Sequence, residues 1–172
     1  HKAKMVPCVE KMPFPSIFQH LQAVAFDLGG TVGSLGGVTQ PRVFFKDSVG
    51  IAPVICYESV YGEFVGEFVQ KGAQAIFIIT NDGWWGDTPG YKQHHTYAQL
   101  RAIEHRRYVV RSANTGTSSV INQRGETLQQ TKWWEPTAIR ATIQMNDELT
   151  FYTQYGDILG RVSLAFGVLL LI

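Results

Sequence analysis

The sequence is poor in cysteine and carries almost no net charge. Its two cysteines, Cys8 and Cys56, form neither a CxxC pair nor a Cys/His cluster at zinc spacing, so we expect no disulfide scaffold and no metal site. The net charge of +1 provides no positive field of the kind that favours nucleic acid, and we do not expect a nucleic-acid partner. With 172 residues, 45% of them hydrophobic, the composition indicates one globular domain with a sizeable core.

Motifs for phosphate or dinucleotide binding are missing as well. Five glycines fall between residues 29 and 37, but they lack the GxxxxGK(S/T) order of a phosphate loop and the strand-to-helix context of GxGxxG. We therefore expect no cofactor. The glycine-rich stretch is predicted to be a flexible surface loop that could serve as a lid.

The ends of the chain have an unusual character. It begins at His1, without an initiator methionine or a signal peptide, which suggests that the sequence starts inside a longer protein. Residues 158–172 contain one charge, Arg161, and stay apolar to the last residue. A membrane span needs roughly 20 apolar residues, so this run predicts the start of a truncated transmembrane helix. A buried C-terminal core helix is the alternative.

Hydrophobic periodicity predicts a mixed α/β domain. Short apolar or alternating runs favour strands, and apolar residues at three- and four-residue steps favour helices. We expect strands at 43–45, 50–55, 75–80, 109–113, 118–121, 127–129 and 137–144, a hairpin turn at 122–125, and helices at 16–28, 60–71 and 95–108. The order strand, helix, strand over 50–80 implies a parallel pair with a right-handed crossover. The continuous apolar run 75–80 favours a strand buried on both faces.

Two features of the helix 95–108 bear on packing and function. Its apolar face is expected to carry Tyr97, Leu100 and Ile103. The histidines in and beside this helix are His94, His95 and His105. They do not form the HExxH motif, so we expect them to be ordinary polar or capping residues and not metal ligands.

In the stretch 50–62, GIAPVICYESVYG, Cys56 directly follows a predicted apolar strand and precedes a predicted turn and helix. Such a setting favours a nucleophile, because the positive end of a helix stabilises a thiolate and backbone N–H groups of the turn can bind an oxyanion. Buried cysteines are commonly small core residues, so packing remains the alternative for Cys56 taken alone. Because parallel strands end at one edge of a sheet, Cys56 should share a crevice with Asn81 and Asp82.

Other candidate residues are weaker when taken one at a time. The adjacent Trp84 and Trp85 could be core residues, a lid, or a membrane-interface anchor, with core packing as the default. The charges of the N-terminal segment, among them Lys2 and Glu10, would ordinarily be solvated loop charges.

Several segments in a fixed order resemble one family. HKAKMVPCVE, PVICYES, TNDGWWG, QLRAIEHRRYVVRSANTGTSSVI and NQRGE together resemble the C-terminal half of the nitrilase-like domain of bacterial apolipoprotein N-acyltransferases, within the carbon-nitrogen hydrolase superfamily. The resemblance covers essentially the whole chain. It departs at Cys8 and Val9, where many members have Phe-Gly.

The resemblance implies a catalytic set. Cys56 matches the nucleophile, and Lys2 matches the triad lysine that stabilises the tetrahedral intermediate. Glu10 matches an additional essential glutamate of the acyltransferases, whereas Tyr57 and Glu58 match the residues after the cysteine in their C-Y-E motif. The triad glutamate, the general base, lies upstream in that family and matches no residue here, so the fragment alone is expected to be inactive.

The implied fold is the C-terminal half of an αββα sandwich over residues 1–157, followed by a truncated transmembrane helix at 158–172. Substrate contacts are expected from the loop after the second parallel strand: Asn81, Asp82, Trp84 and Trp85. A ping-pong reaction would carry an acyl chain from a phospholipid, as a cysteine thioester, to the diacylglyceryl-cysteine of an apolipoprotein acceptor.

The expected setting is a monomer in the bacterial inner membrane, with its catalytic domain on the periplasmic side. Two rival functions stay open at this stage. One is a soluble carbon-nitrogen hydrolase, an amidase or nitrilase of the same fold. The other is a non-catalytic nitrilase-like binding domain in which Cys56 only packs.

Overall fold

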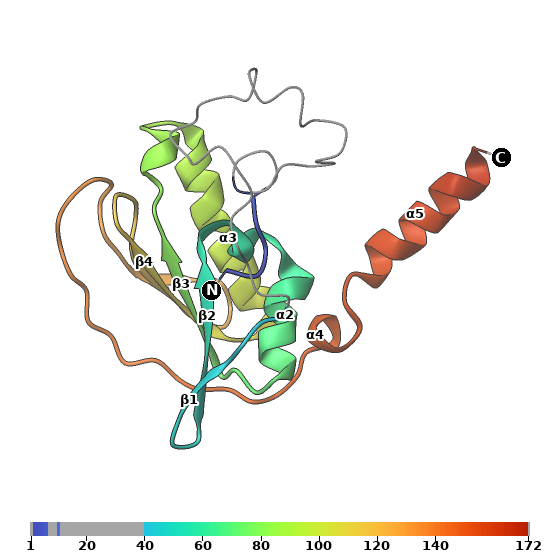
Figure 1. Cartoon of the computed structure of the whole chain (residues 1–172), viewed down its shortest axis with the longest axis horizontal. Coiled ribbons are helices and arrows are strands. Elements are labelled where there is room, and N and C mark those ends of the chain that lie inside the picture. The colour runs from blue at the N-terminus through green and yellow to red at the C-terminus, as the bar shows by residue number, and fades with distance from the viewer. Residues whose placement is uncertain (1, 7–9, 11–39, 172) are drawn as a thin grey trace.

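The computed structural model describes residues 2–6, 10 and 40–171, and its centre is one mixed β-sheet (Figure 1). The predicted helix 16–28, the glycine-rich loop 29–37 and the departure at Cys8 and Val9 lie outside these residues. Six strands are arranged in chain order: β1 (Phe44–Lys46), β2 (Val49–Ile55), β3 (Ala75–Thr80), β4 (Tyr108–Ala113), β5 (Ser119–Ile121) and β6 (Thr127–Gln130). β2, β3 and β4 are parallel, and the remaining neighbours pair antiparallel.

The parallel centre of the sheet confirms the predicted strand–helix–strand unit. β3 has the predicted bounds, and Ile55 at the end of β2 pairs with Ile79 of β3, so both strands end at the same edge of the sheet. The crossover helix is α2 (Gly62–Gln70). It is shorter than predicted because the residues before it wind into a separate 3-10 turn, η2 (Cys56–Val60).

Two helices, α2 and α3 (Pro89–His105), cover one face of the sheet (Figure 1). Alternate strand residues point toward them and are at most 1% exposed: Ala52, Val54, Ile76, Ile78 and Val109. The helices contribute buried apolar partners to the same cluster: Phe64, Val65, Phe68, Ala98 and Ala102. Burial of this apolar surface, worth roughly 25 cal/mol per Å², fixes the helices over the strands.

The opposite face of the sheet is less well covered. Ile79 of β3 is 58% exposed, and Phe77 and Val110 are only partly buried. The prediction that β3 is buried on both faces is therefore wrong for the described residues. Part of the segment that follows β6, residues 137–143, lies over Phe77 and Val110.

The predicted strand 137–144 is also wrong. The segment is extended and makes no strand pairing among the described residues. Ile139 and Ile143 are half-buried, whereas the residues between and beside them are exposed. Alternation indicates an amphipathic extended segment, but it does not by itself provide a neighbouring strand edge with which to exchange hydrogen bonds.

The helix α3 begins six residues earlier than predicted and ends earlier. The side chain of Thr88 caps it by accepting the backbone N–H of Gly90 at 3.3 Å, and Pro89 occupies the first turn, where its missing N–H is not needed. The helix ends where Arg106 adopts a left-handed φ of +50°. Tyr108, predicted as helical, begins β4.

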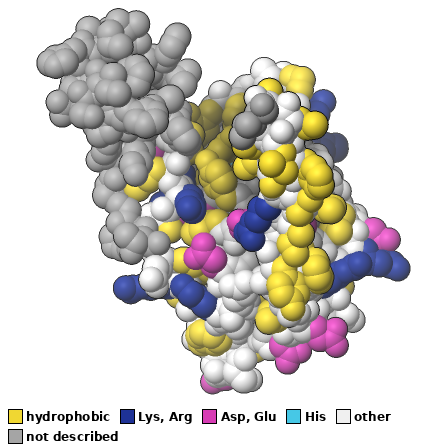
Figure 2. Space-filling view, turned by 90° about the vertical axis from the view of Figure 1, so that its right-hand side faces the viewer, with side chains coloured by type: hydrophobic (Ala, Val, Ile, Leu, Met, Phe, Trp, Pro, Cys, Tyr) yellow, Lys and Arg dark blue, Asp and Glu magenta, His cyan; other side chains and the backbone are white. Residues whose placement is uncertain are grey.

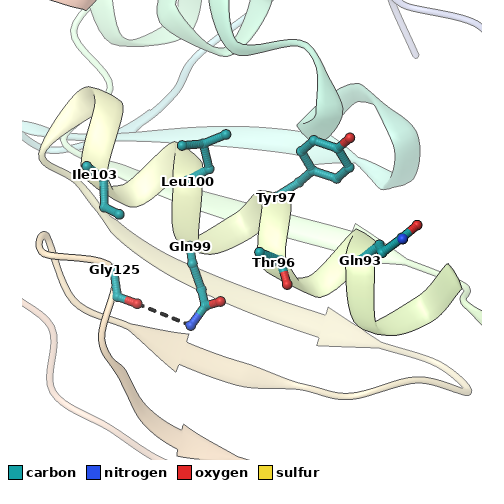
Figure 3. Close-up of a pocket in the computed structure, with 7 residues that line it drawn as sticks. All are labelled: Gln93, Thr96, Tyr97, Gln99, Leu100, Ile103 and Gly125. Carbon is teal, nitrogen blue, oxygen red and sulfur yellow. Dashed lines mark hydrogen bonds between the residues drawn. The ribbon is translucent and has the colours of Figure 1, made fainter. Parts of the chain in front are cut away.

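The predicted apolar face of α3 points outward. Tyr97, Leu100 and Ile103 are 39%, 40% and 44% exposed and line a surface groove (Figure 3). Gln99, on the same helix, donates a 3.3 Å hydrogen bond to the carbonyl of Gly125, in the β5–β6 hairpin (Figure 3). Besides Ala98 and Ala102, the buried side of α3 carries four polar residues: His94, His95, Arg101 and His105.

The chain ends in two helices, α4 (Phe151–Tyr155) and α5 (Ile158–Leu170). α5 projects away from the sheet, and hydrophobic side chains gather along it (Figures 1 and 2). It has no buried residue, so the alternative of a buried core helix is wrong. None of the described helices combines the length and the hydrophobicity needed to cross a membrane. An ion pair of 2.7 Å between Arg161 and Glu63 fixes the start of α5 to α2.

Candidate active site

Cys56 lies at the junction of β2 and η2, at the carboxyl edge of the parallel strands. Its backbone has a φ of +52°, a left-handed conformation that costs a residue other than glycine about 1–2 kcal/mol. The hydroxyl of Ser59 donates to the Cys56 carbonyl at 2.8 Å and helps to hold this turn. The Cys56 thiol is free and Cys56 is partly exposed. Strained turns of this kind are frequent at functional sites.

Glu58 ties the N-terminal segment to the cysteine turn. Its side chain is 2% exposed and accepts three backbone N–H groups. One oxygen accepts from Ala3 at 2.6 Å and from Lys4 at 2.9 Å, and the other accepts from Ile55 at 2.8 Å. Because both oxygens are engaged by amides, the geometry gives Glu58 a positioning role instead of a role in proton transfer.

Lys2 and Glu10 form a close ion pair beside this turn. Lys2 Nζ lies 2.5 Å from Glu10 Oε2, and the two side chains are 12% and 18% exposed. The same oxygen of Glu10 accepts the backbone N–H of Val6 at 2.8 Å. The structure therefore brings the predicted lysine and glutamate into one cluster, and Glu58 anchors that cluster to the turn of Cys56.

Tyr57 is held by aromatic contacts on the inner side of the turn. Its ring packs edge-on to Tyr61 at 5.9 Å between centroids and lies 6.2 Å from the ring of His94. Burial, with a smaller effect from Tyr57, raises the pKa of Tyr61. Within the part of the chain that the structure describes, no acceptor lies against the backbone N–H of Tyr57.

The loop after β3 holds the remaining predicted contacts. Asn81 is exposed, and its side-chain oxygen accepts from the Gly83 N–H at 3.2 Å and from the Thr115 hydroxyl at 2.6 Å. Trp84 and Trp85 lie in a 3-10 turn, η3 (Gly83–Trp85), and are 52% and 38% exposed. They are not core residues, which leaves the lid and the interface anchor as their possible roles.

Asp82 differs from its predicted role, because it is fully buried. One of its oxygens lies 3.0 Å from both the Thr80 hydroxyl and His94 Nδ1, and the other lies 2.5 Å from Arg111. Burial alone would raise the pKa of Asp82, but the hydrogen bond from His94 and the charge of Arg111 outweigh it and hold that pKa at about 2. Asp82 is therefore an ionised group behind the site, not on the surface that would contact a substrate.

Over residues 2–6, 10 and 40–171, no three His, Cys, Asp or Glu side chains group as they would around an ion. The cluster instead combines a thiol, an ammonium and carboxylates.

Comparison with known proteins shows the family of the chain. The family model described as carbon-nitrogen hydrolase matches residues 4–149. The chain belongs to the carbon-nitrogen hydrolase family.

Apolipoprotein N-acyltransferases are among the proteins to which this chain is similar. An apolipoprotein N-acyltransferase of Chlorobaculum tepidum is 34% identical over 99% of this chain and 33% of its own length. The apolipoprotein N-acyltransferase of Pseudomonas aeruginosa is 35% identical over 90% of this chain and 30% of its own length. The chain thus spans about a third of the length of the relatives it matches.

Solved structures support the carbon-nitrogen hydrolase fold. An amidase of the nitrilase superfamily from Nesterenkonia AN1 superposes with a TM-score of 0.50 at 19% identity, covering 62% of this chain and 42% of that one. Saccharomyces cerevisiae Nit3, a member of branch 10 of the same superfamily, gives 0.51 at 20% identity, over 59% and 40%. At this identity the likeness concerns the fold alone.

Three buried residues near the cysteine turn were not predicted from the sequence as parts of the site: Ser59, His94 and Arg111. His94 was expected to be an ordinary polar or capping residue, yet it is 3% exposed and bonds to Asp82 behind the cysteine turn. Its signal in the sequence is a stripe of polar and small residues on α3 at helical spacing, which includes Ala98 and Arg101. In the sequence alone, such a stripe cannot be distinguished from a solvent-exposed helix face, because only packing against the sheet buries it.

Proposed function

We propose that Cys56 is the nucleophile of an N-acyltransferase that acylates apolipoproteins. The observation that carries the proposal is the joint placement of a left-handed Cys56 turn and the Lys2–Glu10 pair, tied together by Glu58. The family membership and the names of the relatives support the same chemistry. The matched relatives are about three times as long as this chain, so the activity is proposed for the whole protein that contains it.

In the first half-reaction, the thiolate of Cys56 attacks an ester carbonyl of a phospholipid. The carbonyl oxygen becomes an oxyanion, which the Lys2 ammonium and the Tyr57 N–H stabilise. Collapse of this intermediate breaks the C–O bond of the ester. The lysophospholipid leaves as an alcohol after taking up a proton, and the acyl chain stays on Cys56 as a thioester.

In the second half-reaction, the free α-amino group of the diacylglyceryl-cysteine of the acceptor attacks the thioester. The C–S bond breaks, an amide forms, and the amine proton returns to the thiol of Cys56. The general base in this scheme is the family's triad glutamate, which the resemblance matches to none of the 172 residues. Glu10 balances the charge of Lys2, and the short contact between them keeps the ammonium in place before the acyl donor binds.

The apolar surface supports a lipid substrate. In the proposal, α5 is the beginning of a membrane-inserted helix, and its side chains point outward: Leu159, Leu164, Phe166 and Leu169 are 63–81% exposed. The exposed Trp84 and Trp85 would contact lipid at the mouth of the site, since indole rings favour the interface of a bilayer. These exposed apolar side chains support a bilayer substrate over a small amide.

The second face of the sheet also has a place in the proposal. Its partly exposed apolar side chains, such as Ile79 and Phe77, are those that would pack against the second sheet of an αββα sandwich. The described residues would then form one half of that sandwich.

The test uses the complete gene that encodes this chain, expressed in a bacterium depleted of its own apolipoprotein N-acyltransferase. We expect growth and triacylated lipoproteins with the wild-type gene, and diacylated lipoproteins with Cys56→Ala. Mass spectrometry of lipoprotein N-terminal peptides distinguishes the two. Triacylation by the Ala variant contradicts the mechanism, and hydrolysis of small amides without lipoprotein acylation would favour the soluble hydrolase.

A further inference from the structure

Four buried polar side chains form one continuous chain of hydrogen bonds behind the cysteine turn. Ser59, His94, Asp82 and Arg111 are each at most 3% exposed and come from η2, α3, the loop after β3, and β4. Ser59 Oγ lies 3.2 Å from His94 Nε2, His94 Nδ1 lies 3.0 Å from Asp82, and Asp82 lies 2.5 Å from Arg111. Buried ionisable groups are costly compared with apolar side chains of the same size. The cost suggests a role besides packing.

The chain of hydrogen bonds ends on the peptide between Cys56 and Tyr57. Ser59 Oγ donates to the Cys56 carbonyl at 2.8 Å. This carbonyl and the N–H of Tyr57 belong to the same planar trans peptide and so point in opposite directions. Holding the carbonyl inward therefore aims the Tyr57 N–H outward. That N–H is the backbone donor proposed above for the oxyanion.

Proton accounting defines what each member does. The Asp82 carboxylate can only accept, so His94 Nδ1 donates to it. The Ser59 hydroxyl has a single proton, and the shorter of its two contacts is to the Cys56 carbonyl, to which it donates. His94 Nε2 must then donate to Ser59 Oγ, which requires a proton on both ring nitrogens of His94. A hydrogen bond to that carbonyl polarises the peptide and makes the Tyr57 N–H a stronger donor.

We propose that Ser59, His94 and Asp82 are positioning residues that aim and polarise the Tyr57 N–H toward the oxyanion formed at Cys56. The inference rests on the proposed function, because it requires Cys56 to be acylated. None of the three side chains needs to touch the substrate. Ser59 acts on the peptide, His94 orients Ser59, and Asp82 fixes the ring of His94.

The experiment compares two reactions of Cys56 in the protein expressed from its complete gene. Alkylation by iodoacetamide requires a thiolate but no oxyanion donor, whereas thioester formation from a diacylphospholipid with an alkyne-bearing acyl chain requires both. For Ser59→Ala we expect the alkylation rate to stay within about twofold. We expect kcat for thioester formation to fall by ~10–100-fold, less than the loss of a whole oxyanion donor, with KM unchanged.

Two further variants separate positioning from folding. Ser59→Thr keeps a hydroxyl and should restore most of the rate. Ser119→Ala is the matched control, because Ser119 is a fully buried serine whose side chain bonds to another histidine, His95, at 2.9 Å. It should form the thioester at the wild-type rate.

Three results would overturn the inference while wild-type Cys56 still forms the thioester. The first is an unchanged acylation rate in Ser59→Ala. The second is a parallel fall of alkylation and acylation, which would mean that the turn itself collapses. The third is an equal loss in Ser119→Ala. A wild-type protein that forms no thioester contradicts instead the proposed function.

Discussion

Replacing Glu58 by glutamine tests the account of how the site is assembled. The amide keeps one acceptor oxygen and turns the other into an NH2 group, which then faces either the Ile55 N–H or the two N–H groups of Ala3 and Lys4. At least one buried donor loses its partner. A hydrogen bond to a charged group is worth about 1.5–3 kcal/mol, and a buried donor left unpaired costs about 1–3 kcal/mol. We therefore expect Glu58→Gln to destabilise the fold by roughly 2–4 kcal/mol.

Chemical denaturation measures this loss, and hydrogen exchange locates it. The amides of Ala3, Lys4 and Ile55 should exchange faster in Glu58→Gln, because the clamp on the N-terminal segment is weakened. The matched control is Glu67→Gln, since Glu67 is an exposed glutamate on α2. The reasoning would be refuted by a variant with wild-type stability and wild-type exchange that has nevertheless lost activity, because that result assigns Glu58 to proton transfer.

Three further predictions concern the ion pair, the buried histidines and α5. Lys2→Met should slow thioester formation by ~10²–10³-fold, as expected for losing one donor to an oxyanion, and a wild-type rate would exclude Lys2 from that role. Burial, with nearby arginines, lowers the pKa of His95 and His105 to about 4, so the unfolded chain takes up protons first as pH falls from about 6.5. The free energy of unfolding should then decrease as the pH falls from 6.5 to 4, by up to roughly 3 kcal/mol per histidine. In thermal melts at pH 7.5 and 5, His105→Gln should lose less stability between the two pH values than the wild type. An equal loss in both proteins would contradict the low pKa assigned to His105. Leu164→Glu, on the exposed side of α5, should reduce co-sedimentation with phospholipid vesicles, whereas Leu128→Glu, on the edge strand β6, should not. Equal binding of both variants to the vesicles would show that α5 does not contact the membrane.

β2 and β3 of the parallel centre were predictable because they are largely apolar runs followed by polar residues. Ala75–Thr80 has the predicted bounds, and the turn after Ile55 delivers Cys56 as expected. The outer parts were harder to predict. Residues 137–144 alternate like a strand, but a pattern along one segment carries no information on whether a partner strand lies beside it.

The supporting residues of the site could not be predicted for a different reason. Periodicity identifies apolar faces, and on α3 it selected Tyr97 and Leu100, which are on the outside. The inner face is held by hydrogen bonds among His94, Asp82 and Arg111, which come together only when three separate elements pack. The family resemblance predicted a catalytic set, but it did not predict these buried supporting residues.

The most direct test of the central claim is the chemical state of Cys56 during turnover. The protein expressed from its complete gene is incubated with a diacylphospholipid in the absence of acceptor, digested, and analysed by mass spectrometry. We predict an acyl chain on the Cys56 peptide that neutral hydroxylamine removes, as expected of a thioester, and that an acceptor peptide with a diacylglyceryl-cysteine also discharges. Acylated lipoprotein formed with Cys56 unmodified throughout, or an acyl chain carried on another residue, would contradict the assignment of Cys56 as the nucleophile.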